Sequence, residues 1–148
     1  MRIKSFRLFE SNERLEKRIK EISDVYEDAK SIEYILEDGG YDFNWKIDTQ
    51  YQSYRIEGDI SDLIRSNSFS SGFFQHRLAN NFIKPVNLKI NIIGKDDKEF
   101  GDYYDISSNM DEVRRFKVLL EEHLDYLPEG SISIDYSQWR LSVLIKLK

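Results

Sequence analysis

Two histidines, His76 and His123, are the residues of this chain best suited to acid–base chemistry near neutral pH. His76 is followed by Arg77, but nothing at the spacing of a metal site or a catalytic triad accompanies the pair. His123 falls in the last turns of a predicted helix, where packing or the helix dipole accounts for it. Catalysis would therefore require the fold to bring a histidine close to a carboxylate.

A cluster of five carboxylates is the second candidate for chemistry, because oxygen ligands at short spacing suit a hard cation. Lys95 and Lys98 interrupt this cluster, and it lacks the alternating acids, central glycine and closing glutamate of a calcium loop. The pattern therefore predicts a solvated, charged hairpin, with no metal and no cofactor. The five residues are Asp96, Asp97, Glu99, Asp102 and Asp105.

Composition excludes several classes of protein. The chain has 148 residues, a formal net charge of −5 and no cysteine, so disulfides, thiolate metal sites and cysteine nucleophiles are excluded. The negative charge argues against direct nucleic-acid binding, which needs a basic surface. No uninterrupted apolar run exceeds three residues, so we expect no membrane-spanning helix. The sequence also lacks a phosphate-binding glycine loop and the serine and zinc hydrolase motifs.

The middle of the chain, residues 66–84, places large aromatic side chains beside a Ser- and Gly-rich loop. Phe69, Phe73 and Phe74 either tuck under the sheet or form an exposed contact surface. In the second case His76 and Arg77 belong to the same interface. The sequence leaves both interpretations open.

The elements that would position these residues follow from hydrophobic periodicity. Apolar residues recur at helical spacing over residues 11–38 and 108–127, and they alternate over five to six predicted strands. Neither kind of element can bury its apolar side alone, so we expect an α+β fold in which two long amphipathic helices cover one face of a mostly antiparallel sheet. The predicted strands are residues 41–48, 54–56, 86–92, 100–106, 132–136 and 139–147, with short helices at 60–66 and 74–83.

The first ten residues differ from the rest of the chain. They carry Arg2, Lys4 and Arg7 against Glu10, a net charge of +2, whereas residues 11–148 carry −7. Together with Ser11, the end of this segment reads Leu8-Phe9-Glu10-Ser11. It resembles the capsid-targeting leader of internal head proteins from large contractile-tailed phages, in which a prohead protease cuts after the glutamate. The resemblance implies a cleavable leader, residues 1–10, before a single domain, residues 11–148.

Three functions are compatible with these observations. The resemblance implies a phage accessory protein that is packaged in the head, reaches the host cytoplasm with the DNA and binds a host protein such as a defence factor, without catalysis. The acidic composition also fits an intracellular interaction module of the immunity-protein or antitoxin type, which neutralises a basic surface. The third hypothesis is a small enzyme that uses His76. A mature chain that starts at Ser11 would distinguish the first from the second.

Overall fold

The centre of the fold is the strand β3 (Val86–Lys95) of a six-stranded antiparallel sheet. The computed structural model describes residues 2–68 and 81–148. Apolar and polar side chains alternate along β3, so that Leu88 and Ile90 are fully buried whereas Asn87 and Lys89 lie on the opposite face. The strand order is β2-β1-β3-β6-β5, and β4 pairs with the end of β3. The bounds are β1 (Tyr41–Asp48), β2 (Ser53–Ile56), β4 (Lys98–Glu99), β5 (Ile132–Tyr136) and β6 (Leu141–Leu147).

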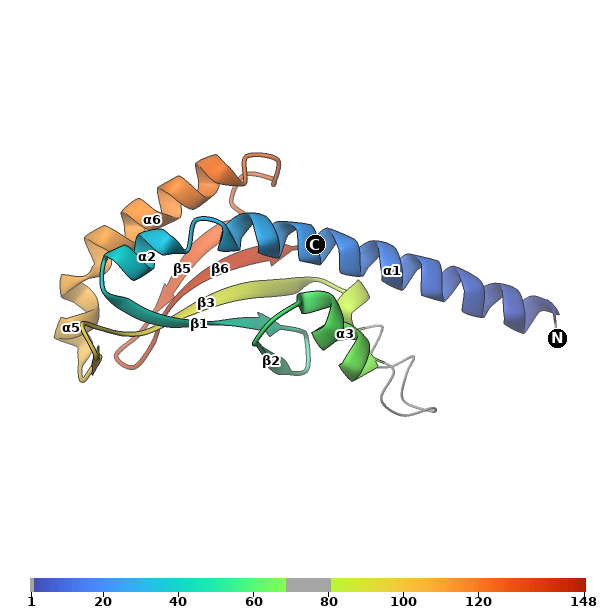
Figure 1. The fold of residues 1–148 in the computed structure, drawn as a ribbon, viewed down its shortest axis with the longest axis horizontal. Helices are drawn as coiled ribbons and strands as arrows, with labels where there is room; N and C mark the ends of the chain where they lie inside the picture. Colours follow the sequence, from blue (N-terminus) through green and yellow to red (C-terminus); the bar gives the residue numbers. More distant parts are fainter. Residues whose placement is uncertain (1, 69–80) are drawn as a thin grey trace.

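Two helices, α1 (Arg2–Lys30) and α6 (Met110–His123), lie over the same face of this sheet (Figure 1). Their apolar stripes, which include Ile22 on α1 and Phe116 on α6, are buried against the apolar face of the strands. The predicted α+β class and the antiparallel sheet are therefore confirmed. The shorter helix α3 (Ile60–Ser68) adds Ile60 and Ile64 to the core.

The helix predicted over residues 11–38 is broken in the structure. A turn at residues 31–33 separates α1 from α2 (Tyr34–Asp38), and the Ser31 hydroxyl donates to the main-chain oxygen of Asp28 at 2.6 Å. The chain then reverses at Gly40, which has φ +84°. This positive φ favours glycine, and a side chain at Gly40 would also force the carboxylate of Asp96 to shift.

The prediction of a strand over residues 100–106 was wrong, because most of this segment belongs to the helix α5 (Tyr103–Ser108). Asp102 is extended, and its carboxylate accepts a hydrogen bond from the main-chain N–H of Asp105 at 3.1 Å, which caps this helix. Tyr104 is 80% exposed and Ile106 is buried. The apparent alternation of residues 100–106 therefore does not reflect a two-sided strand. Of the helix predicted over 74–83, residues 81–83 are helical and residues 74–80 lie outside the described part.

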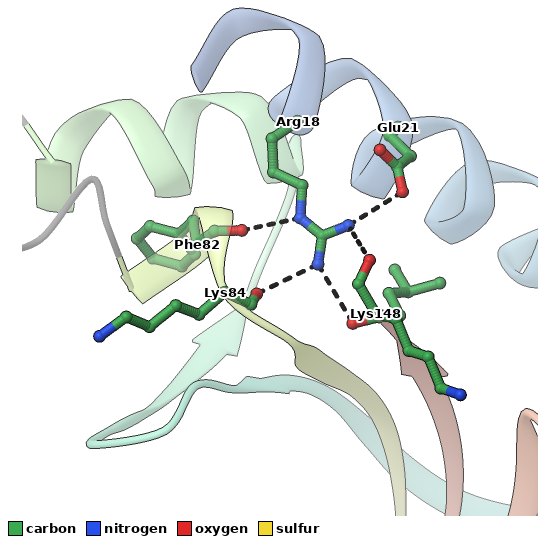
Figure 2. A network of polar contacts seen from close by, with 6 residues as sticks. Arg18, Glu21, Phe82, Lys84 and Lys148 are labelled. Atoms are coloured by element: carbon green, nitrogen blue, oxygen red, sulfur yellow. Dashed lines mark hydrogen bonds and ion pairs between the residues drawn. The ribbon is translucent and has the colours of Figure 1, made fainter. Parts of the chain in front are cut away.

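One buried side chain, Arg18, ties α1 to two distant parts of the chain (Figure 2). Arg18 is 6% exposed, and each of its five N–H groups has an acceptor. Four acceptors are main-chain oxygens of residues just before β3 or at and just after the end of β6, so the guanidinium joins the helix to the ends of both strands. They are the oxygens of Phe82 (2.8 Å), Lys84 (3.1 Å), Leu147 (3.1 Å) and Lys148 (3.1 Å), and the fifth acceptor is the Glu21 carboxylate (2.9 Å).

Replacing Arg18 by alanine should lower the free energy of unfolding by about 3 kcal/mol or more, because four main-chain oxygens lose their donor at once. Urea unfolding followed by circular dichroism measures this loss. Arg14→Ala is the control, because Arg14 lies on the same helix and is exposed, and it should change stability by less than about 0.5 kcal/mol. Equal losses in the two variants would contradict a special role for Arg18.

Candidate functional site

The sheet has an unpaired edge along the first half of β1. β2 is shorter than β1 (Figure 1). β1 has eight residues and β2 has four, and β2 pairs only with residues 45–48 of β1. On its other side β1 pairs with β3 along its whole length. Residues 41–44 therefore have a neighbouring strand on one side only. The sequence carried this signal, because the predicted strand 41–48 is longer than its predicted return at 54–56.

The main-chain groups that face this vacant side can be identified from two hydrogen bonds. The N–H of Thr49 donates to the oxygen of Gln52 at 2.8 Å, toward β2, whereas the oxygen of Gly40 accepts from the N–H of Asp96 at 2.8 Å, toward β3. Successive residues of a strand direct these groups to opposite sides. The main-chain N–H and C=O groups of odd-numbered residues in β1 therefore point toward the β2 side. Tyr41 and Phe43 are odd-numbered residues that lie beyond the end of β2. Neither has a main-chain partner there among the described residues.

A groove of about 590 Å³ lies beside this edge. Tyr26 and Lys30 of α1 form one wall together with Glu33 and Glu37 at α2. Residues 41–45 of β1 and residues 55–58, which end β2 and follow it, complete the lining. We refer to this feature as the β1 groove. It occupies the place into which a longer β2 would have extended.

Aromatic side chains form the wall of the β1 groove nearest the core. The Trp45 indole Nε1–H donates to the Glu33 carboxylate at 2.7 Å, and the Tyr26 ring meets the Trp45 ring edge-on at 5.1 Å between centroids. The Lys30 ammonium lies 5.5 Å from the centroid of the Tyr26 ring. Both aromatic residues are at most 5% exposed, so they fix the wall in place.

The electrostatics of the β1 groove favour a cation. Burial raises the pKa of Tyr26 to about 12, with smaller contributions from the charges of Glu33, Glu27 and Asp59, so its phenol stays neutral well above pH 10 and adds no negative charge to the groove. Four carboxylates line the groove against two cations, and Arg55 already pairs with Glu57 at 3.4 Å. The carboxylates of Glu37 and Asp42 are exposed and have no partner among the described residues. Two negative charges therefore remain uncompensated.

The residues that sequence reasoning proposed as sites lie elsewhere. Leu8, Glu10 and Ser11 fall within α1, so the predicted cleavage point lies inside a continuous helix; the structure describes no side chains there. The predicted contact residues Phe69, Phe73, Phe74, His76 and Arg77 lie outside the described residues. The β1 groove was not predicted, because its carboxylates come from separate elements.

His123 and the carboxylate cluster have structural contacts in the described part. The His123 ring Nε2 lies 2.9 Å from the Ser31 hydroxyl, and the Tyr126 hydroxyl donates to Asp28 at 2.7 Å. These contacts link the end of α6 and the turn after it to the end of α1 and the turn after it. Asp105 accepts from the Gly101 N–H at 2.8 Å. Among the side chains that the structure describes, no three His, Asp or Glu residues converge as a metal site would require.

Comparison of the chain with models of protein families, with curated proteins and with solved structures found no match. The β1 groove therefore has to be interpreted from its own geometry. Among the described residues, no helix combines the length and the apolar composition needed to cross a membrane.

Replacing Tyr26 by phenylalanine should make stability less sensitive to high pH. The unfolded chain ionises tyrosine near pH 10, whereas the raised pKa keeps folded Tyr26 neutral to about pH 12, so stability present below pH 10 is lost as the pH rises through 12. Between pH 10 and 12 the wild type should lose about 2 kcal/mol more than Tyr26→Phe. Urea unfolding at each pH measures this difference. Tyr104→Phe, at a site that is 80% exposed, should follow the wild type.

Proposed function

We propose that this protein is a non-enzymatic interaction module that binds a basic segment of a partner protein in the β1 groove. The observation that carries the proposal is the pair of uncompensated carboxylates, Glu37 and Asp42, beside an unpaired strand edge. A lysine or arginine side chain would neutralise them and gain charge-assisted hydrogen bonds. His76, on which the enzyme hypothesis depends, lies outside the described residues.

The charge of the whole chain supports the same partner class. A formal net charge of −5 attracts a basic protein over several ångströms and accelerates the encounter, while the local carboxylates select the segment that binds. A basic host factor and a basic toxin both satisfy this requirement. The proposal therefore includes the host-binding phage protein and the immunity-type module as two biological settings for one binding site.

The binding proposal can be tested with an end-capped octapeptide of alternating lysine and valine, compared with its glutamate–valine counterpart. The lysine peptide should bind, and the double variant Glu37→Lys/Asp42→Lys should weaken its binding about tenfold or more. Glu13→Lys/Glu122→Lys is the matched control, because it changes net charge equally at two exposed positions away from the groove. Calorimetric titration at low salt measures the affinity. If both double variants bound the lysine peptide equally weakly, the loss of affinity would be due to net charge alone, and this would contradict a binding site in the groove.

We further propose that residues 1–10 act as a head-targeting leader and that the protein is packaged in a phage head. The charge switch at Glu10–Ser11 supports this, and so does the position of the bond on α1, whose N-terminal half projects beyond the sheet (Figure 1). Leu15 is the first residue of α1 described as buried. Because proteases bind extended chains, cleavage there requires the projecting end of the helix to unwind.

The leader proposal predicts a processed chain that begins at Ser11 in purified phage particles. Intact mass spectrometry of the particle proteins measures the start of the chain directly. Expression with Glu10→Gln should leave the full-length mass and lower the amount packaged, because the acidic residue of the cleavage site is lost. Full-length protein found in infected cells and never in particles would contradict the proposal.

A further inference from the structure

We infer that the partner segment binds the β1 groove as an added β-strand, collinear with β2 and hydrogen-bonded to Tyr41 and Phe43. The inference rests on the proposed function and specifies how the basic segment is held. An unpaired strand edge offers main-chain donors and acceptors in a fixed row, which is the requirement for strand addition.

The spacing of the free groups matches a strand. The N–H and C=O groups of Tyr41 and Phe43 face the vacant side, two residues or about 7 Å apart along β1. A partner strand presents groups toward β1 at the same interval, so up to four main-chain hydrogen bonds can form. Each adds modest affinity and requires no particular partner side chain, so the carboxylates have to supply the selectivity.

The protein's own chain cannot fill this place from β2. After Ile56 the chain leaves the sheet edge through Gly58 and enters α3, whose Ile60 and Ile64 are fully buried. Extending β2 would pull these side chains out of the core, at a cost of about 1.5–3 kcal/mol each. The packing of α3 thus keeps β2 from extending along this edge, and in our inference the added strand comes from a second chain.

Carboxylates on both faces of the sheet at this edge determine which charge the partner's side chains should carry. Glu37 belongs to α2, on the helix-covered face, and Asp42 points to the opposite face, because alternate residues of β1 face opposite ways. An added strand also alternates its side chains. A lysine or arginine on either face of that strand therefore meets a carboxylate, whereas an acidic strand meets repulsion on both.

The test is a scan of the lysine–valine octapeptide in which single main-chain nitrogens are methylated in turn. Strand addition predicts that the effect of methylation on affinity alternates along the peptide. Methylation of an N–H that faces β1 should weaken binding about tenfold, and methylation of either neighbouring N–H should leave the affinity unchanged. In the complex, hydrogen exchange of the Phe43 amide should slow at least severalfold. The Asn44 amide already faces β3, so its exchange should not depend on the peptide.

The outcomes separate the two proposals. A flat methylation profile with unprotected Phe43, while Glu37→Lys/Asp42→Lys still weakens binding, would overturn strand addition and leave the proposed function intact. Absence of binding by the unmethylated lysine peptide would overturn both. An alternating profile with protected Phe43 would establish strand addition at this edge.

Discussion

The five hydrogen bonds of Arg18 are the contact on which the rest of the arrangement depends. They fix α1 to the chain entering β3 and to the end of β6, two segments that are far apart in sequence but adjacent in the sheet. With that end of the helix anchored, its apolar stripe crosses the sheet and brings Tyr26 to Trp45. A buried guanidinium is tolerated here because every N–H has an acceptor, and a partly satisfied one would be strongly destabilising.

The same packing that builds the core leaves the β1 edge open. Ile60, Ile64 and Phe82 are fully buried, and their positions require the chain to leave the sheet after four residues of β2. Elsewhere β1 is fully paired, and the tight turn at Gly40 fixes where it starts. The groove is therefore a consequence of unequal strand lengths around a well-packed core. Its rigidity comes from the buried Trp45–Glu33 and Tyr26–Trp45 contacts, which hold the wall in place before any partner arrives.

Charge gives this edge its selectivity. Exposed ion pairs such as Arg55–Glu57 contribute little to stability, so the acidic surface is poorly explained as a device for folding. Charged residues, lysine above all, commonly protect open strand edges against aggregation, and Asp42 and Glu37 can do so here through like-charge repulsion. The same carboxylates admit a basic strand. One arrangement thus discourages pairing of the edge with other acidic chains and favours a partner of opposite charge.

The sequence by itself determined the α+β class, the two long helices and most strands, because a period of 3.6 or 2 is a local property of the chain. Ile22 and Phe116 were recognisable as core residues for that reason. The strand that the sequence predicted over residues 100–106 was not found. Its short alternating pattern also fits a helix, and Asp102 caps the start of the helix α5 that forms there. The β1 groove was decided only by the tertiary structure. Glu37, Asp42 and Tyr26 belong to three elements. Their shared position depends on the strand order and on the anchoring of α1 by Arg18, and spacing along the chain encodes neither.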